Sequence, residues 1–263
     1  MRIIVCMKNV PDPEGPRDAF VINQDTLKVE PRGIPPLISA YDENALEAAL
    51  RLKDANPGAT VIVLSMGRRV PEAVMLKALA AGADELVKVE DEALDPSALD
   101  SFATAAVLAE AVRKLGFDLV VTGRQAADYN DSQTGIILAH LLGLPVVTLA
   151  RTLKKEDGLL HIERVIEKGY EVVTVPLPAV VMCSGEAGEL RYPSMIQRRE
   201  AKNKPKQALT LADLGLSLPK RRVVPARLFA PEVKTAQCTY FTGGSPAEAA
   251  RSLALKLRED RIV

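Results

Sequence analysis

The residues best suited to bind a ligand or take part in chemistry lie in one segment, 121–135, which reads VTGRQAADYNDSQTG. Gly123 would let a ligand approach the main chain, and Arg124 could add a positive charge. Residues 132–135 are expected near the start of a helix, where free N–H groups and the helix dipole favour an anion such as phosphate. The segment therefore indicates a nucleotide site, although a polar, capped loop without a ligand is equally compatible with these residues.

The other side chains of this segment narrow the kind of ligand. Asp128 and Asp131 would repel a phosphate, so they suit ribose hydroxyls, an amine or helix capping better. The segment has neither the GxGxxG of a dinucleotide turn nor the GxxxxGK[ST] of a phosphate loop. A second candidate is 65–69, for which a simple strand-to-helix turn is the more ordinary interpretation. Neutral hydrogen-bonding groups in the first segment come from Gln125, Asn130, Ser132, Gln133 and Thr134.

Composition gives little support to other kinds of chemistry. Among the 263 residues, Lys plus Arg and Asp plus Glu each number 34, so no global basic field exists to bind nucleic acid or a membrane surface. The three cysteines lack CxxC spacing and the two histidines are far apart, which argues against a disulfide framework, a metal site and catalysis by histidine or cysteine. No apolar run reaches the roughly 18 residues needed to span a bilayer. We therefore expect a soluble, cytoplasmic protein.

Around the polar segment, short apolar runs typical of buried strands alternate with stretches whose apolar residues have helical spacing. Because this βα repetition is typical of a parallel sheet with helices on both faces, ligands are expected beyond the carboxyl ends of the strands. The loops after Met7, Leu64 and Thr122 are therefore the candidate sites. The predicted strands are 3–7, 60–64, 85–89, 118–122 and 145–149. The predicted helices are 42–53, with Asp42 as N-cap, and 71–81, 101–115 and 132–142.

The pattern changes after residue 159. Residues 160–166 and 170–175 alternate around a turn, which predicts an antiparallel hairpin. Residues 193–226 are rich in Pro, Lys and Arg and have little apolar periodicity, so they are expected to lie on this domain or on a partner. A last amphipathic helix is predicted at 246–259. We therefore expect a nucleotide-binding domain over 1–192 and a C-terminal arm over 193–263.

Four motifs in the right order make the whole chain resemble the beta subunit of electron transfer flavoproteins. They are Asp42-Glu43-x-Ala45-Leu46-Glu47, then Gly123-Arg124-Gln125-Ala126-x-Asp128 with Gln133-Thr134-Gly135, then Ile162-x-Arg164-x-x-Glu167-x-Gly169-x-Glu171-x-Val173 with Pro178-x-Val180-Val181, and Glu189-x-Arg191-Tyr192 before basic residues. The resemblance implies a Rossmann-like, doubly wound α/β fold of the adenine-nucleotide alpha-hydrolase type. It also implies an antiparallel hairpin and a C-terminal arm that embraces an alpha subunit.

The resemblance further implies an electron carrier rather than an enzyme. FAD would be held mainly by the alpha subunit, and the beta subunit would bind AMP in the ordinary type. In the electron-bifurcating type, which oxidises NADH, the beta subunit would bind FAD instead. Thr134 favours AMP, but both alternatives stay open. The heterodimer would take electrons from acyl-CoA dehydrogenases or similar flavin dehydrogenases and pass them to a quinone-linked oxidoreductase.

The family's site residues can be carried over by position. Partner-binding residues would be Ala187, Glu189, Arg191 and Tyr192, with Ala187 standing where the family often has an anchoring Leu. Nucleotide contacts would fall on Cys6, Ser39, Ala40, Tyr41, Asp42, Met66, Gly123, Arg124, Gln125, Ala126, Ala127, Asp128, Tyr129, Asn130, Asp131, Ser132, Gln133 and Thr134.

Two other classes of protein share this kind of fold. An adenylating ATP pyrophosphatase would need an SGGxDS phosphate loop after the first strand, but residues 8–15 contain prolines where free N–H groups are needed. A stand-alone adenine-nucleotide-binding protein would lack the hairpin and the arm. Both classes are therefore weaker explanations than the flavoprotein subunit.

Overall fold

The computed structural model describes residues 1–95, 99–231 and 238–263. The chain divides into two compact units, Met1–Leu228 and Phe229–Val263. Each unit is described by itself.

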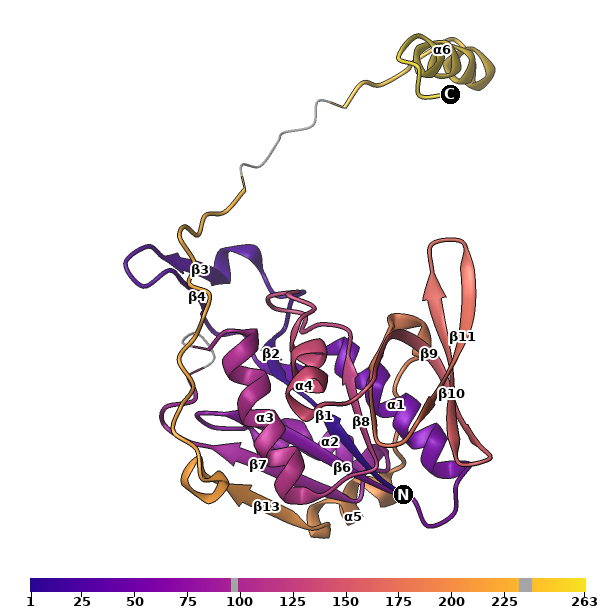
Figure 1. Ribbon diagram of the computed structural model, residues 1–263. Helices are drawn as coiled ribbons and strands as arrows, with labels where there is room; N and C mark the ends of the chain where they lie inside the picture. Colours follow the sequence, from indigo (N-terminus) through magenta and orange to yellow (C-terminus); the bar gives the residue numbers. More distant parts are fainter. Residues whose placement is uncertain (96–98, 232–237) are drawn as a thin grey trace. The chain divides into compact units, whose positions relative to one another are not determined.

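The first unit is built on a nine-stranded sheet (Figure 1). Its strand order is β11-β10-β9-β12-β8-β1-β6-β7-β13. All neighbouring pairs are parallel except β9–β10 and β10–β11. The strands are β1 (Arg2–Cys6), β6 (Thr60–Gly67), β7 (Glu85–Glu90), β8 (Leu119–Gly123), β9 (Val146–Glu156), β10 (Leu159–Ile166), β11 (Gly169–Pro176), β12 (Ala179–Cys183) and β13 (Lys206–Leu209).

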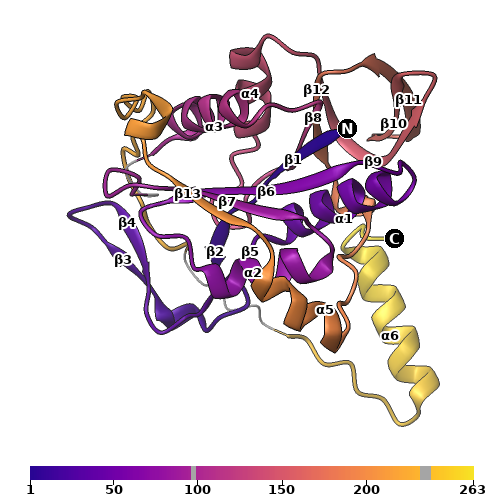
Figure 2. The same ribbon diagram turned by 90° about the horizontal axis from the view of Figure 1, so that it is seen from below.

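Helices cover both faces of the sheet (Figure 2). One face packs against α1 (Ala40–Asp54) and α2 (Glu72–Ala81), and the other packs against α3 (Ser101–Leu115) and α4 (Thr134–Leu142). The central strands are therefore buried on both sides, which is why their sequences are continuous apolar runs. The Rossmann-like α/β fold is confirmed, and each of the four helices lies within two residues of its predicted bounds.

The order of the strands creates a switch point beside β1. From β1 the chain proceeds through β6 and β7 on one side, and then returns to place β8, β12 and β9 on the other side. The loops after β1 and β8 therefore leave the sheet in opposite directions. In open α/β sheets, the crevice between such loops is where ligands bind.

The antiparallel hairpin is confirmed, and it is longer at its base than the sequence pattern indicated. β10 and β11 pair through eight residues each, and β9 continues to Glu156 to pair with β10. Leu149 has a φ of 58°, and the register between β9 and β10 shifts at Glu163/Arg164. This irregularity lets β9 run parallel to β12 in its first part and antiparallel to β10 in its second part.

Residues 193–228 belong to the first unit, so the compact boundary lies after Leu228 rather than after residue 192. This segment contains α5 (Met195–Glu200) and β13, which pairs with β7. Leu209 and Leu211 are only 4% and 5% exposed. β13 has only four residues and no clear alternation, so its sequence carries little strand signal.

Short strands between residues 9 and 38 were also not predicted from the sequence. They form two hairpin-like pairs: β2 (Asn9–Pro11) with β5 (Pro36–Ile38), and β3 (Phe20–Asn23) with β4 (Lys28–Pro31).

The second unit, which we call the arm (residues 229–263), contains α6 (Pro246–Glu259). Ser245 and Glu248 form a capping box at the start of α6, which confirms the predicted helix. Within the described residues, no helix is at once long and apolar enough to cross a bilayer.

The boundary predicts different outcomes for two truncations. A chain that ends after Leu228 should keep the thermal midpoint of the first unit. A chain that ends after Tyr192 removes β13 together with Leu209 and Leu211, and should lose at least about 4 kcal/mol of the free energy of unfolding. Thermal and urea unfolding followed by circular dichroism measure both effects. Equal stability of the two truncated chains would contradict this boundary.

Candidate functional site

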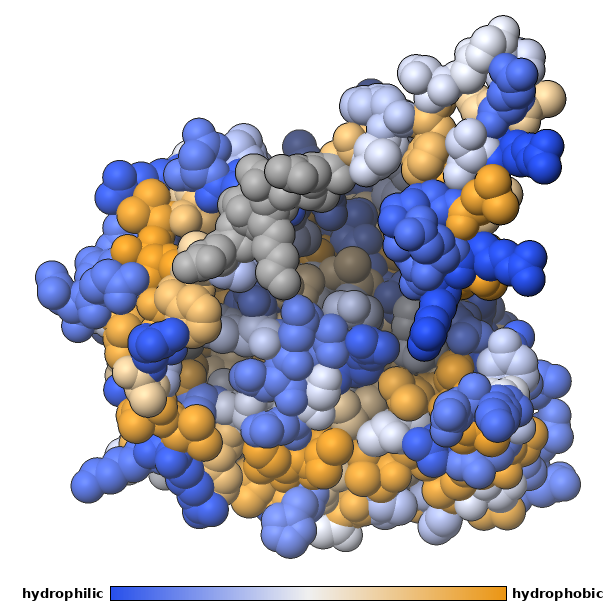
Figure 3. Space-filling view, turned by 90° about the horizontal axis from the view of Figure 1, so that it is seen from above, coloured by the Kyte–Doolittle hydropathy of each residue, from blue (hydrophilic) through white to orange (hydrophobic). Residues whose placement is uncertain are grey.

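A pocket of about 220 Å³ opens at the carboxyl ends of β1, β6 and β8, beside the starts of α3 and α4. Figure 3 views the molecule from the side on which these loops lie, and hydrophilic residues occupy much of the middle of that face. The pocket thus lies at the switch point of the sheet. The predicted nucleotide-contact residues that line it are Cys6, Asp42, Met66, Gly123, Arg124, Gln125, Ala126, Tyr129, Asp131, Ser132, Gln133 and Thr134.

The other predicted contacts lie around the pocket without lining it: Ser39, Ala40, Tyr41, Ala127, Asp128 and Asn130. The Ser39 hydroxyl accepts a hydrogen bond from the Ala127 N–H at 3.3 Å. Asp128 forms an ion pair with Lys8 at 2.7 Å. In the structure these two residues hold the loop in place.

Asp42 joins the three chain segments that form the pocket. One carboxylate oxygen accepts the Lys8 N–H after β1 at 2.8 Å, and the other accepts the Gly123 N–H at the end of β8 at 3.3 Å. The prediction that Asp42 caps α1 is wrong, because the helix begins at Ala40 with Ser39 as the N-cap residue. Asp42 is only 7% exposed. Burial raises its pKa to about 7, although the N–H groups of Lys8 and Gly123 lower it in part.

The glycine that begins the loop is also required by the packing of α1. A Cβ on Gly123 would lie 2.6 Å from the nearer Asp42 oxygen and 2.7 Å from the Tyr41 carbonyl carbon. Gly123 is therefore needed so that the first turn of α1 can approach β8, and its expected role in admitting a ligand stays a prediction. Gly135 is similarly confined, because its Cβ would lie 2.8 Å from Met182 Cγ and from Thr122 Oγ1.

The loop from 124 to 133 is held by its own polar groups. The Gln125 amide donates to Asn130 Oδ1 at 2.7 Å and accepts from the Ser132 hydroxyl at 2.8 Å. Asn130 and Ser132 both have positive φ, at 56° and 58°. Ser101 at the start of α3 donates to Asp131 at 3.2 Å. These contacts give the rim of the pocket a defined shape before any ligand binds.

Several lining residues were not predicted from the sequence. The most informative is Asn9, whose side-chain nitrogen is buried and has no hydrogen-bond partner within the described part of the chain. A buried donor left without a protein partner suits an acceptor on a bound ligand. Its only sequence signal was its position just after the first strand. The other polar lining residues outside the candidate segments are Lys8, Asp100, Ser101 and Thr104, whereas Arg69 and Thr122 belong to the candidate segments 65–69 and 121–135.

The inner part of the pocket is apolar. Leu64, Met66 and Leu108 line it together with Cys6. Burial raises the pKa of the Cys6 thiol to about 12, with Asp42 adding to the effect. The thiol is therefore protonated at neutral pH and is a poor nucleophile. An apolar floor with a polar rim fits a nucleotide, whose base is flat and largely apolar and whose ribose and phosphate are polar.

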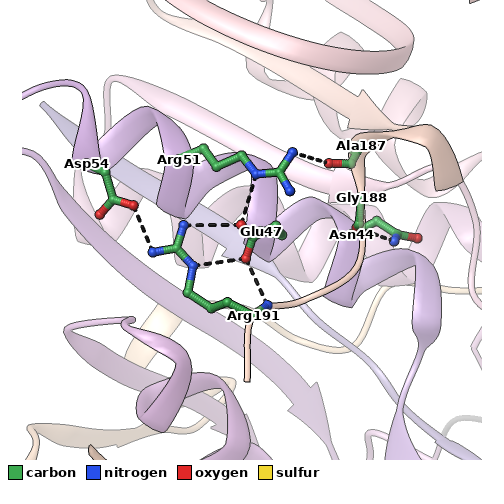
Figure 4. Close-up of polar contacts among 7 residues, drawn as sticks. All are labelled: Asn44, Glu47, Arg51, Asp54, Ala187, Gly188 and Arg191. Carbon is green, nitrogen blue, oxygen red and sulfur yellow. Dashed lines mark hydrogen bonds and ion pairs between the residues drawn. The ribbon is translucent and has the colours of Figure 1, made fainter. Parts of the chain in front are cut away.

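A second region predicted to be functional lies outside the pocket, where residues 187–191 cross α1 (Figure 4). Arg191 donates to Glu47 through its main-chain N–H and its Nε, each at 3.0 Å, and to Asp54 at 2.8 Å. Arg51 binds Glu47 at 2.9 Å and the Ala187 carbonyl at 3.0 Å. We call Glu47, Arg51 and Arg191 the α1 clamp. It fixes the course of the segment that precedes α5.

The four predicted partner-binding residues therefore differ in accessibility. Ala187 is only 1% exposed, so its side chain cannot reach a partner in this structure. Arg191 is bound within the chain, whereas Glu189 is exposed and Tyr192 is 87% exposed. Met195 and Ile196, which follow Tyr192 closely in the sequence and were not predicted as partner contacts, are each 68% exposed. Among the described residues, no cluster of His, Cys, Asp and Glu could hold a metal ion.

Two glycines give a matched test of the approach between α1 and β8. Gly123→Ala should lower the free energy of unfolding by about 1–3 kcal/mol, because the new methyl group overlaps Asp42 and the Tyr41 main chain. Gly185→Ala should change it by less than about 0.5 kcal/mol, because among the described residues no atom lies within 4 Å of the added Cβ. Urea unfolding measures both values, and similar values for the two variants would refute the tight approach.

The α1 clamp predicts a pH-dependent stability. Burial raises the pKa of Glu47, but the hydrogen bonds from Arg191 outweigh it and lower the pKa below its usual range. The ionised form therefore contributes stability above the unfolded pKa of about 4.3, and this contribution is lost as the pH falls through the folded value. Glu47→Gln should cost about 1–3 kcal/mol at pH 7, and the difference from the native chain should shrink at lower pH.

The control for this prediction is Glu92→Gln, because Glu92 is 78% exposed and pairs with Arg68 at the surface. Its effect should stay within about 0.5 kcal/mol throughout. A Glu47→Gln effect that does not change between pH 7 and pH 3 would show that the carboxylate charge is not what stabilises the clamp.

Comparison with known proteins shows which family the chain resembles. The family model of the electron transfer flavoprotein domain matches residues 26–214. Caffeyl-CoA reductase-Etf complex subunit CarD of Acetobacterium woodii is 37% identical over the full length of both chains. Electron transfer flavoprotein subunit beta of Thermoanaerobacterium thermosaccharolyticum is 34% identical, also over both full lengths. The corresponding subunit of Clostridium acetobutylicum is 40% identical over 74% of this chain and 73% of its own. The chain therefore belongs to the electron transfer flavoprotein beta-subunit family.

Proposed function

We propose that this chain binds an adenine nucleotide, foremost AMP, in the pocket beside β1 and β8, and pairs with an alpha subunit that holds the electron-carrying FAD. The observation that best supports the nucleotide is the unpartnered amide of Asn9, buried at a pocket that combines an apolar floor with a polar rim. In this arrangement the base lies against Leu64, Met66 and Leu108. The ribose and phosphate lie toward the rim.

The rim offers suitable groups for both polar parts of the nucleotide. Asp131 could accept hydrogen bonds from ribose hydroxyls. Arg69 and Arg124 could neutralise a phosphate, and the first turn of α4 could donate N–H groups to it. The role of this chain is to hold a nucleotide and partners. Electron transfer itself takes place through flavin, from a flavin dehydrogenase to a quinone-linked oxidoreductase.

The surface after the α1 clamp is proposed to receive the flavin dehydrogenase. Tyr192, Met195 and Ile196 are exposed apolar side chains, and the exposed Arg198 and Arg199 follow them. Aromatic residues, Met and Arg are enriched at protein interfaces. One relative is named as a subunit of a caffeyl-CoA reductase complex. This name supports a CoA-dependent enzyme as a partner of the heterodimer, and a reductase in that position would take electrons from it.

FAD in place of AMP is the second candidate, and one observation favours it. A larger, open groove of about 970 Å³ adjoins the pocket and shares Asn9, Arg69 and Val70 with it. A dinucleotide whose adenosine part occupied the pocket could extend into this groove. In that case the chain would carry a second redox flavin, and oxidation of NADH with electron bifurcation would be the activity of the heterodimer.

The test is to purify the chain with its alpha subunit, denature the complex, and identify the released nucleotides by chromatography and mass. One FAD and one AMP per heterodimer are expected. Two FAD per heterodimer would establish the second candidate. Release of FAD alone, at one per heterodimer, would refute nucleotide binding by this chain.

A variant in the pocket tests the site itself. Asn9→Ala should weaken nucleotide binding about tenfold, because it removes one hydrogen bond to the ligand, and it should leave the unfolding midpoint nearly unchanged. Asn56→Ala is the matched control, since its amide donates to the Leu52 carbonyl at 2.7 Å beyond the end of α1. Titration calorimetry with AMP and with FAD measures the affinities. Equal affinities of the two variants would show that the ligand does not bind Asn9.

A further inference from the structure

The last stretch of the first unit, residues 219–228, leads directly into the arm, and we call it the arm root. Asp100, which precedes α3, binds it through two hydrogen bonds. Asp100 accepts the main-chain N–H groups of Arg222 at 2.5 Å and of Val223 at 2.9 Å through one oxygen. Its other oxygen accepts the Ala103 N–H at 2.8 Å and so caps α3. The same carboxylate therefore serves the helix and the arm root.

Other contacts also hold the arm root. The Arg222 guanidinium lies over the Phe102 ring, 3.5 Å from its centre. At the other end of the root, the Gln24 amide donates to the Leu228 carbonyl at 3.3 Å. The N–H groups around Asp100 also lower its pKa, although burial acts in the opposite direction. The carboxylate is therefore ionised at neutral pH, when its hydrogen bonds to the root are strong.

Asp100 also lines the pocket, as does Ser101 next to it. Ser101 donates to Asp131, which belongs to the loop between β8 and α4. An unbroken series of contacts thus leads from the loop, through the start of α3, to Arg222 and Val223. A ligand that contacts the loop or Asp100 would change the position or the mobility of the Asp100 carboxylate, which holds the arm root.

We propose that Asp100 is a positioning residue that links the pocket to the arm root. This inference rests on the proposed nucleotide site. A nucleotide in the pocket steadies the start of α3, and Asp100 then holds residues 222–223 more firmly. Because such coupling is reciprocal, anything that holds the arm root in place, such as a partner subunit bound to the arm, raises the affinity for the nucleotide by the same factor.

Asp100→Asn separates the two tasks of this side chain. Asparagine is a good N-cap, so its amide oxygen can still accept the Ala103 N–H. Its NH₂ group cannot accept from Arg222 and Val223. The matched control is Asp213→Asn, since Asp213 also accepts a main-chain N–H, from Thr210 at 2.8 Å. Asp213 is not among the residues that line the pocket.

The experiment is hydrogen exchange at the amides of Arg222 and Val223 in the full chain, with and without AMP or FAD, alongside calorimetry with the same nucleotides. In the native chain a bound nucleotide should slow this exchange. In Asp100→Asn the exchange without nucleotide should be about tenfold faster, and the nucleotide should no longer slow it. Asp213→Asn should behave as the native chain does.

The failures can be told apart. If a nucleotide binds but exchange at residues 222–223 of the native chain does not change, the linkage is wrong and the proposed nucleotide site stands. If Asp100→Asn exchanges at the native rate, Asp100 does not hold the root. If calorimetry detects binding of neither nucleotide, both the proposed site and the linkage fall.

Discussion

The carboxylate of Asp42 is the contact on which the geometry of the pocket depends. It accepts main-chain N–H groups at the ends of β1 and β8, two strands that lie side by side at the switch point of the sheet. It comes from the first turn of α1, which can reach β8 only because residue 123 is glycine. One buried side chain therefore sets the distance between a helix and the two loops that border the pocket. Substitutions at Gly123 act on the pocket through this contact.

The same helix supports the segment that leads to the proposed partner surface. Asp42 lies in the first turn of α1, and Glu47 and Arg51 lie further along it, where they hold residues 187–191. α1 thus connects the pocket with the segment that leads to the exposed residues Tyr192, Met195 and Ile196. Buried carboxylates are costly unless they are hydrogen-bonded. The two on α1 accept most of their hydrogen bonds from segments distant in sequence, so they fix tertiary structure.

Much of the fold could be predicted because its central strands and four large helices have strong apolar periodicity. The loop 123–134 was identified from its glycine and its polar side chains, and most of its residues line the pocket. Short elements could not be predicted in this way. β13 has four residues, and its pairing with β7 depends on a neighbour far away in the sequence. The sequence placed Asn9 after the first strand and Asp42 at the start of a helix, but their hydrogen-bonding roles depend on contacts that only the folded chain creates.

The most direct test of the central claim is photolabelling of the full chain with 8-azido-AMP, followed by mapping of the labelled peptides. The pocket predicts labels within residues 6–9, 64–70, 99–108 or 122–135, and excess AMP should suppress them. Labels confined to other parts of the chain, or labels that AMP does not suppress, would contradict a nucleotide site at the switch point beside β1.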